Sequence, residues 1–287
     1  MEIVGKKIGL VDDSFRHYPY SAVLGEVPSF FEWDRLSPFA HGIVVFTNEN
    51  ILSESRESIP RSSRIAWLQE SKGILGHLYK NVESVISEYQ IFLTHDSKFL
   101  QEFENAYFLP GGGVYIGNSF GGGIAEVTKK IRMCSIVSSF KRTTPMHEIR
   151  NAIAKKMKSL HDTNFEVFGG SPYLFDYLPI FQTLRDFRFS IVVENTLDDY
   201  YFTEKILNCF ATGTVPIYMG ARKISNFFNI NGIIPFHSVR QLYRSITPIL
   251  STSLYEEMMP AILENFELVK NFRCTEDYVW REYLNKL

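Results

Sequence analysis

The sequence predicts an α/β protein made of two parallel-sheet domains that face a cleft, and two observations support this fold class. Short apolar runs rich in β-branched and aromatic residues alternate with segments of helical periodicity, which is typical of a parallel sheet covered by helices. This alternation occurs twice in the 287 residues, before and after the glycine-rich stretch 109–127. We therefore expect an N-terminal domain over residues 1–125 and a C-terminal domain over residues 126–287 that ends in a helical tail.

The first half contains apolar runs that predict strands and two segments that predict helices. The length and β-branched content of the runs fit strands better than helices. The predicted strands are 6–11, 42–46, 64–68, 90–95 and 106–110. The segment 73–89 repeats apolar side chains every four residues from Ile74 to Ile86, as a helix with one buried face does. A shorter helix is predicted over 97–106.

The second half repeats the alternation and shows clearer helix ends. Strands are predicted over 132–139, 164–170, 188–195, 214–220 and 231–236, and helices over 144–160, 176–187, 203–213, 224–228 and much of the chain from about residue 238. Thr144 and Thr203 stand where the hydroxyl of a capping residue would accept from free helix amides, and Pro145 fits a first helical position. Gly213 stands where a helix would end.

Composition and charge exclude several classes of protein. Lys and Arg number 30 against 32 Asp and Glu, which argues against a protein that coats nucleic acid or an anionic membrane. Charges interrupt the first residues, MEIVGKKIGLVDDS, and no segment approaches the about 18 uncharged apolar residues of a membrane span. We therefore expect a cytoplasmic protein with no nucleic-acid partner and no membrane span.

Several familiar site signatures are absent from the sequence. The three cysteines, Cys134, Cys209 and Cys274, are too far apart for a disulfide framework or a CxxC metal site. There is no Asp-x-Asp triplet, no pair of histidines with metal-ligand spacing, no phosphate-binding loop and no GxSxG. These absences disfavour P-loop NTPases, Rossmann dehydrogenases, metal-dependent transferases and α/β-hydrolases.

Candidate functional residues lie where predicted strands end, because ligands of open parallel sheets bind outside the carboxyl ends of the strands. Strand 188–195 leads into a polar loop and then a helix with Lys205 in its first turn. A lysine there opposes the helix dipole, and a phosphate bound by the helix amides would explain it. A salt bridge from this lysine to Glu194, Asp198 or Asp199 is the alternative.

Arg150 and Glu70 are the other two candidates. The guanidinium of Arg150 could bind a diphosphate through two parallel hydrogen bonds, or it could pair at the surface with Glu148 or Asp162. Glu70 ends an apolar strand, and a carboxylate in a partly dry cleft can act as a general base. Its alternative role is to cap the helix that follows.

The stretch 189–220, FSIVVENTLDDYYFTEKILNCFATGTVPIYMG, resembles the signature block of family-10 glycosyltransferases, the α1,3-fucosyltransferases. That block has a Glu-Asn pair, a variable loop, Tyr-x-Thr-Glu-Lys, an apolar helix and Gly-x-Val-Pro-Ile-x-x-Gly. Two further segments are similar to the family. SSFKRTTPMHEIRNAI places the family's arginine at Arg150, with Ser138 and Ser139 where Ser-Asn is usual. RIAWLQES places its glutamate at Glu70, without the proline often found nearby.

The resemblance implies two Rossmann-like domains facing a cleft, the type-B glycosyltransferase architecture. It implies a nucleoside-diphosphate sugar, usually GDP-fucose, bound mainly by the C-terminal half, a glycan acceptor, inversion at the anomeric carbon, no obligatory metal and no cofactor. The implied donor-binding residues are Arg150, Glu194, Asn195, Tyr201, Glu204 and Lys205. Of these, Arg150 and Lys205 would bind the diphosphate, and Glu70 would be the base on the acceptor hydroxyl.

Two other interpretations stay open. The motif indicates a nucleotide and a diphosphate more directly than a particular sugar, so a related transferase using another donor, such as a UDP-pentose, would keep Arg150 and Lys205. The second is a non-catalytic nucleotide- or sugar-binding protein on the same fold, which the presence of Glu70 beside both cations disfavours. The N-terminal domain, whose residues 1–60 match no part of the family, would select the acceptor.

Overall fold

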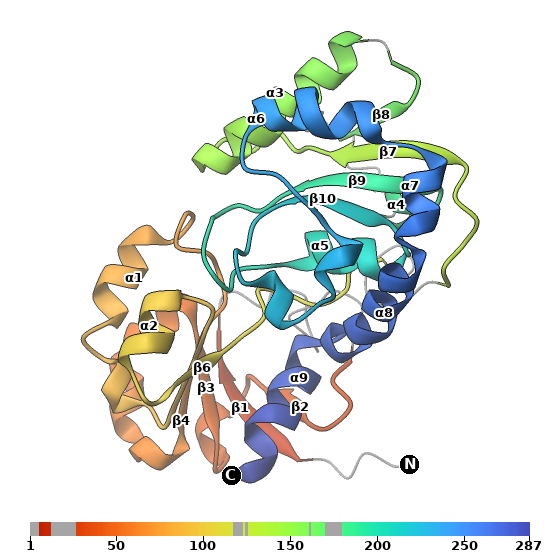
Figure 1. Ribbon diagram of the computed structural model, residues 1–287. Coiled ribbons are helices and arrows are strands. Elements are labelled where there is room, and N and C mark those ends of the chain that lie inside the picture. The colour runs from red at the N-terminus through yellow and green to blue at the C-terminus, as the bar shows by residue number, and fades with distance from the viewer. Residues whose placement is uncertain (1–5, 13–26, 117–122, 124–125, 161, 170–179) are drawn as a thin grey trace.

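The computed structural model describes residues 6–12, 27–116, 123, 126–160, 162–169 and 180–287, which form two parallel sheets (Figure 1). The first sheet has the strand order β2-β1-β3-β4-β5-β6 and the second the order β11-β10-β9-β7-β8. Neighbouring strands in both sheets run parallel. The predicted fold class of two α/β domains is confirmed.

The strands agree closely with the apolar runs of the sequence. Those of the first sheet are β1 (Lys7–Val11), β2 (Glu32–Asp34), β3 (Val44–Thr47), β4 (Arg64–Leu68), β5 (Ile91–Thr94) and β6 (Ala106–Phe108). Those of the second are β7 (Arg132–Val137), β8 (Phe165–Phe168), β9 (Phe187–Val193), β10 (Val215–Met219) and β11 (Ile234–Pro235). β2 was not predicted, because its three residues, EWD, carry no apolar run.

The helices are also close to those predicted, with three exceptions, of which the first is the predicted helix 224–228, where the structure has only a 3₁₀ turn at Ile224–Asn226. They are α1 (Gly76–Val82), α2 (Ser97–Glu102), α3 (Pro145–Leu160), α4 (Ile180–Leu184), α5 (Glu204–Ala211), α6 (Val239–Gln241), α7 (Thr252–Glu257), α8 (Met259–Val269) and α9 (Thr275–Glu282). The predicted helix 73–89 is shorter in the structure, and a 3₁₀ turn at Ile86–Glu88 follows it. The part of helix 176–187 before residue 180 lies outside the described residues. None of the described helices is long and apolar enough to cross a membrane.

Each sheet is covered on both faces. In β4, Ala66 and Leu68 face the core under α1 and α2, whereas Ile65 and Trp67 face the opposite core. That second core includes Val279 of α9, so the C-terminal helix packs on the first sheet (Figure 1), while its Tyr278 also packs against a core of the second domain. The boundary at residue 125 stays a prediction. The helical tail predicted for the second domain returns to the first sheet.

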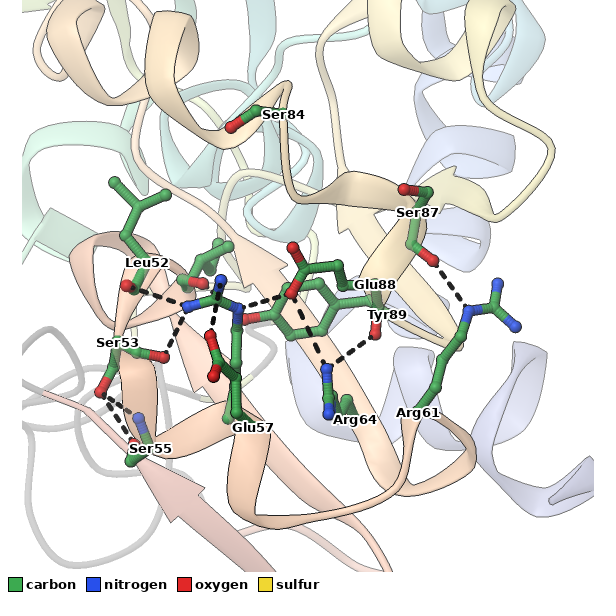
Figure 2. A network of polar contacts seen from close by, with 12 residues as sticks. Leu52, Ser53, Ser55, Glu57, Arg61, Arg64, Ser84, Ser87, Glu88 and Tyr89 are labelled. Atoms are coloured by element: carbon green, nitrogen blue, oxygen red, sulfur yellow. Dashed lines mark hydrogen bonds and ion pairs between the residues drawn. The ribbon is translucent and has the colours of Figure 1, made fainter.

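A polar network fastens the irregular connection 48–63 to the rest of the first domain (Figure 2). Arg56 is only 8% exposed and donates to two backbone carbonyls of this connection and, at 2.9 Å, to the carboxylate of Glu88. Arg61 donates to the carbonyl of Ser87 at 2.8 Å. The network lies near the amino end of β4 and leaves the carboxyl ends of the strands free to face the other domain.

Candidate active site

A fully buried carboxylate sets the start of α5. Glu194 follows β9, and its Oε1 accepts from the Thr203 amide at 3.0 Å while its Oε2 accepts from the Thr203 hydroxyl at 2.7 Å. Thr203 caps α5, as predicted, by accepting from the amide of Lys205. Burial raises the pKa of Glu194, and the nearby charge of Lys205 opposes this rise. Glu194 thus fixes where the helix begins.

The positive charge of Lys205 is balanced by two neighbouring carboxylates. Its Nζ lies 3.2 Å from Glu204 Oε1 and 3.4 Å from Glu194 Oε2, and it donates to Thr203 Oγ1 at 2.9 Å. Burial lowers the pKa of Lys205, but the two carboxylates outweigh burial and raise it. The salt-bridge alternative therefore holds for Glu194. These carboxylates also resolve the conflict with the helix dipole, so a bound anion is not needed to explain Lys205.

Arg150 lies on the inner side of α3, with 7% of its surface exposed. Its Nη1 donates to the carbonyl of Val193 at 3.1 Å and weakly to Asn195 Oδ1 at 3.5 Å, while its buried Nε has no partner among the described residues. Burial lowers the pKa of Arg150, although a guanidinium stays charged in a protein. The predicted alternative, a surface pair with Glu148 or Asp162, is wrong because the side chain is buried. A buried cation with a spare donor is costly without a ligand.

Arg150 and Lys205 line one cavity of about 500 Å³ at the carboxyl edge of the second sheet. Lys141 and Glu204 are its other charged lining residues, so the cavity carries more positive than negative charge. Asn195 also lines it. Both the volume and the position beyond the strand ends are those of a small-molecule site, and the charge favours an anionic ligand.

His147 is a cavity residue that the sequence analysis missed. It is 1% exposed and stands one helical turn before Arg150 on α3. Its Nδ1 lies 3.0 Å from Thr144 Oγ1, the hydroxyl that caps α3 by accepting from the His147 amide. Burial and then the charges of Arg150, Lys205 and Lys141 lower the pKa of His147 to about 4, so its ring is neutral near pH 7. The sequence signal for this residue was its spacing of three from Arg150, which places both side chains on the same face of a helix.

Glu70 belongs to the other domain, two residues beyond β4. Its Oε1 accepts from the Ser71 amide at 2.7 Å. The helix-cap alternative is wrong, because α1 begins at Gly76 and its first turn has no side-chain cap. The turn after Glu70 reaches the second domain, where the Gly73 amide donates to Thr196 Oγ1 at 3.0 Å. The structure thus brings the Glu70 loop against the loop that follows Asn195.

Tyr201 makes a second contact between the two domains. Its ring is 2% exposed and lies 4.6 Å from the ring of His95, which follows β5.

The structure gathers four predicted donor-binding residues, Arg150, Asn195, Glu204 and Lys205, around the cavity. Glu194 and Tyr201 are buried and are not among its lining residues, and Glu70 stands in the facing domain.

Within the described residues there is no group of three or more His, Cys, Asp or Glu side chains that could hold a metal ion.

Comparison with known families agrees with the resemblance read from the sequence. The sequence model described as Glycosyltransferase family 10 (fucosyltransferase) C-term matches residues 127–258. This segment contains Arg150, Asn195 and Lys205, so it covers most of the cavity. The resemblance to family 10 is confirmed over these residues.

A curated relative and two solved structures extend the comparison. The Helicobacter pylori protein Alpha-(1,3)-fucosyltransferase FucT is 26% identical over 113 residues, which make up 38% of this chain and 23% of that relative. A crystal structure of α1,3-fucosyltransferase with GDP-fucose matches with a TM-score of 0.53 and 14% identity, covering 94% of this chain and 90% of that one. The structure of TarM matches with a TM-score of 0.56 and 11% identity over 85% and 54% of the two chains.

These structural matches concern the fold. Both extend over most of this chain, and both belong to glycosyltransferases with two facing α/β domains. The predicted type-B glycosyltransferase architecture is confirmed. The family domain and this fold together support the prediction of a glycosyltransferase.

Proposed function

Since residues 127–258 match the C-terminal domain of glycosyltransferase family 10, we propose that the protein is an inverting, metal-independent glycosyltransferase. It transfers L-fucose from GDP-fucose to a hydroxyl of a glycan and needs no cofactor. The observation that carries this proposal is that the buried Arg150, whose Nε has no partner in the described part of the chain, lines the same cavity as Lys205. The solved fucosyltransferase with GDP-fucose supports the choice of donor, because it shares this fold.

The donor binds with its diphosphate between Arg150 and Lys205. As the bond between the anomeric carbon and the phosphate oxygen breaks, negative charge builds on the leaving diphosphate and must be offset. The guanidinium of Arg150 supplies an Nε donor that has no partner among the described residues, and Lys205 supplies an ammonium on a side chain that is 21% exposed. Both charges are held in place before the reaction, so little reorganisation is needed when the transition state forms.

Glu70 acts from the facing domain. The acceptor hydroxyl attacks the anomeric carbon on the side opposite the diphosphate, and the carboxylate of Glu70 takes the hydroxyl proton. Attack from the opposite side inverts the anomeric configuration. Such base assistance contributes about 10² to 10⁴ in rate.

A thermal-shift panel of GDP, UDP and CDP sugars, followed by assays of donor turnover, tests the proposal. A ligand present at 100 times its Kd stabilises the protein by about 2.7 kcal/mol, which raises Tm by several degrees. Protection by GDP-fucose with turnover is the expected result. Protection by UDP sugars alone identifies the transferase with another donor, and binding without turnover on any acceptor identifies the non-catalytic binding protein.

A further inference from the structure

We propose that Asn48 is a positioning residue. It holds the backbone of Glu70 so that the carboxylate of Glu70 can reach the acceptor hydroxyl. This inference rests on the proposed function, in which Glu70 is the catalytic base. Asn48 belongs to no motif of the sequence analysis, and it lies outside the segment that matches the family.

Asn48 binds the Glu70 loop directly. Its side-chain Oδ1 accepts from the amide of Gln69 at 3.1 Å and from the amide of Glu70 at 3.2 Å. The residue is 5% exposed, so water competes little for these hydrogen bonds. One side-chain oxygen therefore fixes two successive peptide units, the second of which belongs to Glu70 itself.

The backbone of Asn48 is strained. Its φ of 43° is in the left-handed region, and Asn48 is the only non-glycine residue with positive φ in the described part of the chain. Asparagine tolerates this conformation better than most residues, but it remains a sparsely populated one. Strain of this kind persists where the surrounding structure imposes it and is concentrated at functional sites. Here it directs the Asn48 side chain toward the Glu70 loop.

Tyr79, supported by His95, holds the next peptide unit through the carbonyl of Glu70. The hydroxyl of Tyr79 donates to the carbonyl of Glu70 at 2.7 Å. Because that hydroxyl proton is committed, the contact of 3.1 Å between Tyr79 Oη and His95 Nε2 is a donation from the imidazole. Both rings are at most 2% exposed. The amide and the carbonyl of Glu70 are thus each held by a buried side chain.

The parallel sheet explains why these groups meet. Asn48 follows β3, Glu70 follows β4 and His95 follows β5, and these are adjacent strands of the first sheet (Figure 1). Their carboxyl ends therefore lie at one edge, the edge that faces the second domain through the Gly73–Thr196 contact. The carboxylate of Glu70 is left to meet the acceptor, while its backbone is fixed to the sheet.

Substitutions at Asn48 test this role in the full-length protein. In Asn48→Gly the acceptor is lost, but glycine adopts positive φ without strain, so the fold is kept. We expect kcat to fall about 10- to 100-fold with an unchanged KM for the donor, because misplacing a catalytic group by about 1 Å costs on the order of 100-fold. Asn48→Asp keeps an acceptor oxygen and should restore kcat at neutral pH, with the acid limb of the pH profile moved to higher pH by the added charge near Glu70.

Two controls separate positioning from folding. Asn105→Ala removes a side chain that donates to the carbonyls of Ile86 and Tyr89 in the same domain, and it should lower Tm without changing kcat. In a Glu70→Gln background, Asn48→Gly should have no further effect on kcat, because both changes act on one group. An unchanged kcat in Asn48→Gly, or a full multiplicative loss in the double variant, overturns the inference. Wild-type turnover by Glu70→Gln instead overturns the assignment of the base, and this inference with it.

Discussion

Replacing Arg150 by methionine should separate ligand binding from folding. Methionine has a similar length, so it fills the space while removing the charge. Among the described residues, Arg150 makes one good hydrogen bond, to Val193 O at 3.1 Å, and its Nε has no partner. A hydrogen bond from a charged donor is worth about 1.5–3 kcal/mol, whereas burying an incompletely paired ion costs several kcal/mol. We therefore expect the free energy of unfolding to change by less than about 2 kcal/mol.

Donor binding should respond very differently. Truncating one partner of a buried charge pair at a binding interface costs about 2–5 kcal/mol, which is roughly 30- to 4,000-fold in Kd. Isothermal titration calorimetry with GDP-fucose measures this loss, and urea unfolding measures stability on the same samples. Arg150→Met should therefore bind the donor much more weakly while unfolding at nearly the wild-type urea concentration.

Arg56 provides the matched control, since it is 8% exposed but fully engaged in the network of Figure 2. Arg56→Met leaves two carbonyls and the carboxylate of Glu88 without their partner and should destabilise by about 3 kcal/mol or more, with donor affinity unchanged. If Arg150→Met destabilises as much as Arg56→Met, or binds the donor as tightly as the wild type, the assignment of Arg150 to the ligand is refuted.

Three further predictions concern buried ionisable groups. Lys205→Ala removes the cation beside Glu194, whose pKa is already raised by burial, so the variant loses stability as pH rises above about 4.3, and urea unfolding should show a wider gap from wild type at pH 8 than at pH 5. His147 has a pKa of about 4, below the unfolded value, so the wild type should lose stability as pH falls from 6.5 to 4, and an equal loss in His147→Gln would contradict this. Lys130 is 4% exposed, burial lowers its pKa to about 7, and it donates to the carbonyls of Arg185 and Thr212 at 2.8 and 2.6 Å. Lys130→Met should lower the urea midpoint by the equivalent of about 2–4 kcal/mol, because these carbonyls lose their donor. A loss below about 1 kcal/mol would show that these hydrogen bonds contribute little to stability.

The secondary structure was predictable because its signals are local. The apolar run 64–68 became β4 without change. Thr203 stands at the start of α5, where its hydroxyl caps the helix, and Gly213 follows its end at a φ of 66°, which a residue without a Cβ adopts easily. β2 was missed because a three-residue strand containing two acids has no apolar pattern. The packing of α9 on the first sheet was missed because contacts between distant segments leave no trace in local periodicity.

The sequence identified most residues of the site, but it did not show which of them line the cavity and which are buried beside it. The Glu-Asn and Glu-Lys pairs of the motif look equivalent in sequence, yet Glu194 is fully buried under Thr203 whereas Glu204 lines the cavity. Asn48 could not be found, because its role depends on a backbone angle and on the adjacency of β3 and β4. His147 was overlooked because a single histidine on a helix is usually a packing residue. Its lowered pKa depends on burial and on the neighbouring charges of Arg150, Lys205 and Lys141, which only the folded structure shows.

The stereochemistry of sugar transfer tests the central claim most directly. Proton NMR of the wild-type protein with GDP-fucose and a glycan array, in the presence of a metal chelator, reports both donor turnover and the anomeric configuration of the product. The account predicts release of GDP and a product of inverted configuration, with turnover lost in Glu70→Gln and Arg150→Met. A product that retains the donor's configuration, a requirement for added metal, or no transfer from any nucleotide sugar would contradict it.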